Sequence, residues 1–510
     1  MNKVNQLKMG TILTYINLGI GSIIPLIYTP IMLRLLPQNE YGLYSLSNSV
    51  IGYLSLLSFG FGSAIVRYVT KYKIEGNKEE QQKIIGLFIF IYTILAGIVI
   101  IFGSVLVCNV ETIFSTGLNS SEIIKLKIMI LIMTINTAVT FPASVYSAIT
   151  VVYERFVFRK SVDIFSTILM PVLNLIVLLL GYKSIGLTIA SCIAQLIIIP
   201  LNIYYCRNKL NIKPIFKDMP FRIIKELISF SGFVFLASIV DMLYWSTDKV
   251  LIGSMIGASA VAIYNVGGTF TNMIQQLSMG ISSVLIPRIT GMVFNECSNE
   301  ELSDLFIKIG RLQFIIVSLV VTGFIVFGRQ FIIFMAGVGY EDAYIVALLT
   351  MIPLSIPLIQ NTGLNILIAK NKHKFRAIIY TIIAVLNVIS TVFAIKYWGI
   401  IGAVFCSCIA FTLGNVVIIN IYYAKVIKLD IIRFWNNIIK MSIVPIVMTI
   451  FGFCVSLLVG IETVPKFLVG VIIYTLLYVM SMIRFAMNQY ERNIFLKPIN
   501  KMYRKTLRIS

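Results

Sequence analysis

Apolar runs of about 20 residues follow one another along the whole chain, and this pattern restricts the fold more than any other feature. About 20 residues of helix cross the hydrocarbon core of a bilayer. Inside lipid every backbone amide needs a partner within the protein, so a spanning segment is a helix or a strand of a closed barrel. Runs such as residues 84–107 lack the alternation of a barrel strand. The sequence therefore predicts an all-α polytopic membrane protein.

Composition agrees with this prediction, because charged residues make up only 12% of the chain and roughly 25% of a soluble domain. The first apolar stretch is longer than the core of a signal peptide, and no small-residue cleavage site follows it, so we interpret it as a span. We expect about 14 transmembrane helices, at residues 11–33, 42–66, 84–107, 123–149, 163–181, 185–206, 226–247, 259–287, 312–332, 343–369, 377–395, 400–423, 441–460 and 467–484.

The basic residues predict the orientation of these spans. With the N-terminus in the cytoplasm, only eight of the 42 Lys and Arg fall on the outer side, as the positive-inside rule requires. Both termini are therefore expected in the cytoplasm. The net charge of +21 reflects this topology, and we expect no nucleic-acid partner because the basic residues are spread over many short loops. The eight outer residues are Arg34, Lys125, Lys127, Lys183, Lys249, Arg329, Lys396 and Lys466.

Residue patterns of metal sites and common catalytic centres are not found. The spacing of Cys406 and Cys408 is not that of a zinc motif, and the single histidine, His373, lies in a basic loop. The sequence has no HExxH, GxSxG or P-loop pattern. We therefore expect no enzyme activity, no bound metal and no cofactor.

The chain contains an internal repeat. Residues 191–194 (SCIA) recur as residues 407–410, and residues 202–205 (NIYY) recur as residues 420–423. Looser matches keep the same order at an offset of about 220 residues. Six spans in each copy is an even number, so both copies cross the membrane in the same direction, as in transporters whose halves rock about a central site.

This repeat predicts four parts. Residues 1–210 and 211–425 are expected to form two parallel six-helix lobes around a central cavity. Two appended transmembrane helices follow at residues 426–484, and residues 485–510 form a basic cytoplasmic tail.

The eighth predicted span carries a stripe of polar and small residues at helical spacing. Helix packing and a hydrophilic cavity both explain such a stripe, and both interpretations stay open for its small residues. The cavity is favoured for Asn272, Gln275 and Gln276, because large amides at membrane depth need several hydrogen-bond partners. The stripe comprises Asn265, Gly268, Asn272, Gln275, Met279 and Ser282.

Asp241 lies between apolar residues of the seventh predicted span, about two turns before the pair Asp248 and Lys249. A carboxylate at membrane depth is costly unless a cation, a proton or an arginine compensates it. A coupling cation, a bond to Lys249 and a protonated aspartate all satisfy this requirement, and the three alternatives stay open.

Ordered motifs in both halves resemble the polysaccharide-biosynthesis flippases, which act on O-antigen and capsule precursors and belong to the multidrug/oligosaccharidyl-lipid/polysaccharide exporter superfamily. In the first half these motifs are residues 30–37 (PIMLRLLP), 40–44 (EYGLY) and 59–68 (FGFGSAIVRY). In the second half they are residues 247–253 (TDKVLIG) and 285–287 (LIP).

This resemblance implies a multi-pass protein of the bacterial plasma membrane that moves an oligosaccharide on undecaprenyl diphosphate from the cytoplasmic to the outer leaflet. It also implies that cavity-facing arginines hold the diphosphate, since the guanidinium fork matches phosphate. The matching arginines are Arg34, Arg67 and Arg288. We expect substrate contacts from these three residues and from Lys249, Asn272, Gln275 and Gln276.

The resemblance also implies coupling to an ion gradient, with sodium and protons both open. Superfamily relatives pair an acidic residue of the seventh helix with an asparagine of the eleventh, and Asp241 and Asn387 match these positions, with Asp248 nearby. Expected partners are the lipid-linked oligosaccharide, the bilayer, and a polysaccharide polymerase or other assembly proteins.

Two alternative functions remain. A multidrug extruder of the same superfamily would have the same fold and a different cargo. A membrane polymerase or ligase would need catalytic groups on a sizeable outer loop, and the longest predicted outer loop, residues 108–122, is short and lacks histidine.

The distribution of basic residues predicts opposite locations for two reporter fusions. A reporter active only outside the cytoplasm should be inactive after Ser510 and active when inserted within residues 108–122, because the fourteen-span arrangement places these points on opposite sides of the membrane. Activity of the reporter after Ser510 would contradict this topology.

Overall fold

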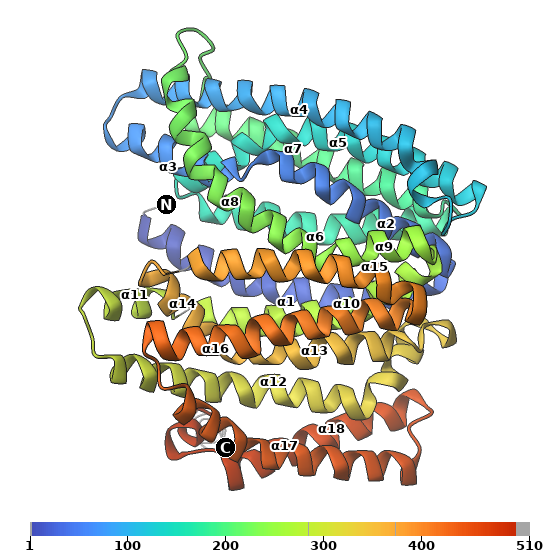
Figure 1. Ribbon diagram of the computed structural model, residues 1–510. Coiled ribbons are helices and arrows are strands. Elements are labelled where there is room, and N and C mark those ends of the chain that lie inside the picture. Colours follow the sequence, from blue (N-terminus) through green and yellow to red (C-terminus); the bar gives the residue numbers. More distant parts are fainter. Residues whose placement is uncertain (1–2, 284, 373, 496–510) are drawn as a thin grey trace, which may run out of the picture. The chain divides into compact units, whose positions relative to one another are not determined.

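The computed structural model describes residues 3–283, 285–372 and 374–495, and helices with short connections make up this part of the chain, without any strand (Figure 1). The predicted all-α architecture is confirmed for these residues. His373 and residues 496–510 of the predicted tail lie outside them. The α-helices are α1 (Lys3–Leu35), α2 (Gln38–Ser55), α3 (Phe61–Ile74), α4 (Lys78–Phe114), α5 (Ser120–Val152), α6 (Phe156–Leu179), α7 (Ser184–Leu210), α8 (Ile224–Trp245), α9 (Thr247–Met255), α10 (Ala258–Ser283), α11 (Ile286–Phe294), α12 (Asn299–Ala336), α13 (Ala343–Ile359), α14 (Asn361–Ala369), α15 (Lys374–Phe411), α16 (Ile419–Tyr422), α17 (Ile431–Val459) and α18 (Val464–Ser481).

Short 3₁₀ and π segments extend or connect these helices. The 3₁₀ turns are η1 (Leu56–Ser58), η2 (Phe221–Ile223) and η3 (Val338–Tyr340). The π segments are η4 (Thr412–Ile418), η5 (Tyr423–Ile427) and η6 (Met482–Ala486).

Within the described residues every predicted span falls largely on helix, but the predicted number of fourteen complete spans is not confirmed. Within the described residues, 10 helices are long and apolar enough to cross a membrane, or up to 12 if each of two bent helix pairs counts as one span. One reason is that residues Phe375–Ile427, which include two predicted spans, count as one candidate span. The two predicted spans meet within α15 near Gly399, where φ is 56° and ψ is −137°. A second reason is α10, which carries the polar stripe and is not among the ten. Separating α15 at Gly399 and including α10 would restore a count of 14, which stays a prediction.

The junction between α2 and α3 explains how one predicted span became two helices. Phe59 and Gly60 both adopt left-handed backbone conformations there, with φ of 50° and 66°. Such conformations suit glycine, and they interrupt the helical hydrogen bonds for one turn. Residues Gln38–Ile74 nevertheless remain one candidate membrane span.

The chain divides into two compact units. Unit 1 contains Met1–Asn265 and Ala384–Ala403, and unit 2 contains Val266–Ile383 and Val404–Ser510. These units reflect packing, and they do not test the predicted division into sequence repeats. The lobes at residues 1–210 and 211–425, the appended helices and the tail therefore stay predictions.

In unit 1, α4 and α5 lie side by side (Figure 1), and α3 and α7 pack against α5. Aromatic side chains join three of these helices. The rings of Phe61 and Tyr92 are 6.3 Å apart and those of Tyr92 and Phe141 are 5.8 Å apart, both edge to face. This favourable ring geometry lies inside a continuous buried core.

A buried carboxylate ties together the N-terminal ends of three helices in unit 1. Glu40 of α2 is only 2% exposed. Its carboxylate pairs with the Lys125 ammonium of α5 and accepts a hydrogen bond of 3.3 Å from the Ser184 amide of α7. Lys125, which interrupts an apolar run in the sequence, is therefore the partner of an otherwise costly buried charge.

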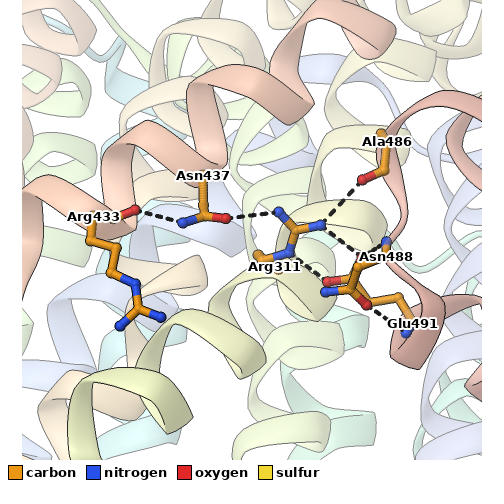
Figure 2. A network of polar contacts seen from close by, with 6 residues as sticks. All are labelled: Arg311, Arg433, Asn437, Ala486, Asn488 and Glu491. Carbon is orange, nitrogen blue, oxygen red and sulfur yellow. Dashed lines mark hydrogen bonds and ion pairs between the residues drawn. The ribbon is translucent and has the colours of Figure 1, made fainter. Parts of the chain in front are cut away.

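In unit 2 a buried ion pair attaches the segment after α18 to the helix bundle (Figure 2). Arg311 of α12 donates to both carboxylate oxygens of Glu491, from Nε at 2.6 Å and from Nη2 at 2.9 Å. Its other nitrogen, Nη1, donates to Asn437 of α17 at 3.2 Å, and Nη2 also donates to the Ala486 carbonyl. Glu491 is fully buried and Arg311 is 9% exposed, so this network satisfies two charges away from solvent.

Removing one partner of this pair should destabilise the protein more than removing both. Arg311→Met and Glu491→Leu each leave an uncompensated buried charge, and each should lower the free energy of unfolding in mild detergent by about 3–5 kcal/mol. The double variant should recover most of that loss because no buried charge remains.

Arg433 provides a matched control, since it pairs with Asp304 at 2.8 Å but its side chain is 50% exposed. Arg433→Met should change the unfolding free energy by about 0–1 kcal/mol. Single Arg311 or Glu491 variants as stable as the Arg433 variant would show that the buried pair does not anchor this segment.

Candidate functional site

Unit 1 contains a polar cavity of about 360 Å³ among otherwise apolar helices. We call it the Lys249 cavity, after the one lysine among its lining residues. Helices α1, α2, α6, α9 and α10 all contribute to it. Its lining residues are Tyr28, Met32, Tyr41, Tyr44, Ser45, Asn48, Ser49, Met170, Pro171, Asn174, Ser246, Lys249 and Asn265.

Helical spacing brings the α2 residues to this cavity. Tyr41, Ser45 and Asn48 recur every three or four positions, so they share one face of the helix. Close packing then brings the start of α10 against the same helix. A Cβ on Gly42 would lie 1.7 Å from the Ala258 carbonyl oxygen, so only glycine allows this approach.

A chain of hydrogen bonds holds the positive charge in place. The Lys249 ammonium donates to Asn265 Oδ1 at 2.7 Å, and Asn265 Nδ2 donates to the Tyr41 hydroxyl at 2.6 Å. The chain thereby joins residues of α9, α10 and α2. An ammonium has three donors, so Lys249 retains donors for an additional acceptor in the cavity.

Asn174 of α6 adds an unsatisfied polar group to the cavity wall. Its side chain is 3% exposed, and its Oδ1 atom has no hydrogen-bond partner among the residues that the structure describes. A buried amide oxygen without a partner is costly unless water or a ligand supplies a donor. The cavity is therefore suited to a polar guest.

Asp248 is adjacent to Lys249 in the sequence but has a different environment. Its side chain is fully buried, and Oδ2 accepts a hydrogen bond of 2.8 Å from the Tyr264 hydroxyl. Successive helical residues point about 100° apart, which separates the carboxylate from the cavity lining. This contact joins α9 to α10, and the predicted role of Asp248 in ion coupling stays a prediction.

The other predicted coupling residues both belong to unit 1 and differ in exposure. Asp241 on α8 is exposed, whereas Asn387 on α15 is 2% exposed. Neither lines the Lys249 cavity. Their proposed cooperation in cation binding stays a prediction.

The three predicted arginines are exposed and do not line the Lys249 cavity. Arg34 is in the last turn of α1, and Arg67 is in α3. Roughly 40 Å of helix, at 1.5 Å per residue, lies between them along the α2–α3 span. Arg288 is in α11 of unit 2. Arg34 and Arg67 are therefore too far apart along the chain's helices to share one site, and the substrate roles of the three arginines stay predictions.

The predicted amides of the α10 stripe belong to unit 2. Asn272 and Gln276 are exposed and Gln275 is half-buried. The two ends of the stripe have different hydrogen-bond partners. Asn265 accepts a hydrogen bond from Lys249, and the hydroxyl oxygen of Ser282 lies 2.6 Å from the Gln313 amide. The substrate role of the three central amides stays a prediction.

The contrast between Lys249 and Asp248 predicts different effects of substitution. Tyr264→Phe removes the hydrogen bond to a buried carboxylate and should lower the free energy of unfolding by roughly 1–3 kcal/mol. Lys249→Met should change it by less than about 1 kcal/mol, since the Asn265 amide can bond to water in the cavity. Chemical denaturation in detergent checks both values, and an equal loss for the two variants would contradict the distinction.

Comparison with known proteins assigns the chain to a family. Residues 7–293 match the family model described as polysaccharide biosynthesis protein. The uncharacterized membrane protein EpsK of Bacillus subtilis (strain 168) is 20% identical over 494 residues, which cover 93% of this chain and 94% of EpsK.

Solved structures of flippases and transporters share the fold. An inward closed structure of the lipid II flippase MurJ has a TM-score of 0.71 at 17% identity, and the match covers 96% of this chain and 99% of the MurJ chain. An inward-facing structure of a multidrug resistance transporter of the MATE family has a TM-score of 0.57 at 16% identity, and the match covers 82% of this chain and 97% of the transporter chain. The match over residues 7–293 spans more than half of the sequence, so the chain belongs to the polysaccharide biosynthesis protein family.

Proposed function

We propose that this chain is a flippase that moves undecaprenyl-diphosphate-linked oligosaccharide from the cytoplasmic to the outer leaflet by alternating access, for the synthesis of a surface polysaccharide. The observation that carries the proposal is the Lys249 cavity, a cationic and hydrogen-bonding space inside an apolar bundle. A diphosphate bearing sugars cannot cross hydrocarbon without such a space, because each unpaired charge there is costly.

The comparisons support a lipid-linked cargo over a drug. The family to which the chain belongs is described as polysaccharide biosynthesis protein. The MurJ structure, named as a lipid II flippase, matches 96% of the chain, whereas the MATE transporter structure matches 82%. A multidrug extruder is therefore the second candidate, and a polymerase is disfavoured because these structural neighbours are a flippase and a transporter.

The roles of the basic residues follow from their positions in the predicted topology. Lys249 and the outer ends of its neighbouring helices would hold the diphosphate near the outer side. Arg34, Arg67 and Arg288 would contact it in succession at helix ends, and Asn272, Gln275 and Gln276 would contact the sugars. Delivery to a polymerase or other assembly protein would follow at the outer face.

Surface-glycan display in cells that lack the native chain tests this function. Lys249→Ala should lower display at least about tenfold, because it removes charge-assisted hydrogen bonds of roughly 1.5–3 kcal/mol. Lys249→Arg should retain part of the activity, and Arg34→Lys should be more active than Arg34→Ala since lysine keeps the charge.

Lys127→Ala is the matched control, because Lys127 is paired with Glu111 at 3.0 Å and does not line the cavity. It should support normal display. If alanine variants of Lys249, Arg34, Arg67 and Arg288 all support normal display at normal protein abundance, the proposed headgroup contacts are wrong.

Ion coupling is a separate part of the proposal. Asp241 would bind the coupling cation together with Asn387. Proteoliposomes with an imposed sodium or proton gradient test this role: Asp241→Asn should keep basal flipping but lose its gradient dependence. A wild-type protein that ignores both gradients would refute ion coupling, and an Asp241→Asn variant with the wild-type response would refute the role of this residue.

A further inference from the structure

Unit 1 contains a second polar cavity, of about 290 Å³, between α5, α6 and α7. We call it the α5–α7 cavity. No residue lines both this cavity and the Lys249 cavity. Hydroxyl groups of Ser147 and Ser166 and the amides of Gln195 and Asn202 lie on its wall, beside the aliphatic side chain of Ile199.

One acceptor on this wall is buried and unsatisfied. Asn202 is 6% exposed, and its amide nitrogen donates to the Ile198 carbonyl at 3.1 Å, which determines the orientation of the amide. Its Oδ1 atom then has no hydrogen-bond partner within the described residues. A guest with a donor group would relieve this cost.

The cavity also has donors, but little unbalanced charge. The lining carries one positive and one negative charge, and these are paired, since Arg159 Nε lies 3.2 Å from Asp163 Oδ1. Lys160, whose Nζ lies 3.3 Å from Asp163 Oδ2, does not line the cavity. Gln195 Oε1 already accepts a hydrogen bond of 2.7 Å from Asn136, so its amide nitrogen is the group that remains as a donor. Donors and acceptors are therefore interleaved around a small space with aliphatic sides.

This arrangement favours a sugar ring over a phosphate or an alkyl chain. Each sugar hydroxyl both donates and accepts, and the C–H faces of the ring fit aliphatic side chains. A phosphate offers mainly acceptors and would leave Asn202 Oδ1 unpaired, whereas an alkyl chain would leave every polar group unpaired. The volume is at the lower end of ligand sites, which suits a single sugar unit.

The position of the cavity agrees with a first contact from the cytoplasm. The lining residues of α6 lie near its start, and those of α7 run from its middle toward its end, before the basic Arg207 and Lys209. The positive-inside pattern assigns these ends to the cytoplasmic side. Along α6, the residues lining the two cavities are centred about nine positions apart, roughly 14 Å at 1.5 Å per residue.

We propose that the α5–α7 cavity binds a sugar unit of the lipid-linked substrate at the cytoplasmic side, an inference that rests on the proposed flippase function. The sugar is recognised by the unsatisfied amide oxygen together with the neighbouring hydroxyl groups and amide donors. The diphosphate is recognised elsewhere. Substitutions in this cavity therefore discriminate between a lipid that carries sugars and one that does not.

The test measures binding of two lipids to the full-length chain in nanodiscs. The probes are undecaprenyl diphosphate and the lipid-linked oligosaccharide purified from the source cells. Asn202→Leu and Ser166→Ala should each weaken binding of the oligosaccharide lipid by roughly threefold to tenfold, as expected for one lost hydrogen bond. Both should bind undecaprenyl diphosphate like wild type, which also verifies that they are folded.

Asn208→Leu is the matched control, because Asn208 is an exposed asparagine of the same helix that does not line the cavity. It should bind both lipids like wild type.

If the cavity variants weaken the binding of both lipids equally, or leave the binding of the oligosaccharide lipid unchanged, the sugar site is overturned. If Lys249→Ala weakens the binding of both lipids while the cavity variants bind both lipids like wild type, only the sugar site fails. If the wild-type chain binds neither lipid, the proposed function fails and the sugar site fails with it.

Discussion

A polar group inside an apolar helix bundle needs a partner, and this requirement explains much of the internal organisation of the chain. Glu40 pairs with Lys125, Arg311 pairs with Glu491, and Asp248 accepts from Tyr264. Each contact joins two different helices or segments, so a buried charge that would otherwise be costly is compensated where they meet. The Lys249 cavity and the α5–α7 cavity differ from these satisfied contacts. Each has on its wall a buried amide oxygen, that of Asn174 or Asn202, that lacks a hydrogen-bond partner among the described residues.

The proposed flippase function uses this same difference. A transporter must hold a polar cargo without binding it irreversibly, so its cavities need polar groups that water and substrate can satisfy in turn. Structural ion pairs would then keep the bundle intact while the cavities exchange their contents. The helical backbone is interrupted at Phe59–Gly60 and at Gly399, and local breaks of this kind are where helices bend.

The sequence predicted the helical architecture well because hydrophobic runs report directly on the bilayer. It predicted the place of the long apolar helices but not of the short helices α9 and α11, and the number of complete spans depends on how Gly399 and the polar stripe of α10 are treated. It also drew attention to Asn265 within that stripe. The hydrogen bond from Asn265 to Tyr41 joins residues 224 positions apart, and no local pattern reveals such a pair. Likewise, Lys125 looked like an interruption of a span until its buried partner, Glu40, was known. Asn202 was visible in the sequence only as part of the repeat at residues 202–205, and nothing in the sequence singled out Asn174, since the importance of both comes from burial without a partner for the amide oxygen.

The most direct test of the account is transbilayer movement of the lipid-linked oligosaccharide by the purified chain. The lipid is placed in both leaflets of proteoliposomes, and a membrane-impermeant enzyme that modifies the sugar reports the fraction reached from outside. The enzyme should modify nearly all of the lipid when the chain is present and only the outer-leaflet share in protein-free liposomes. Equal fractions in the two preparations, with uptake of a cationic drug by the same proteoliposomes, would contradict the flippase and support the multidrug extruder.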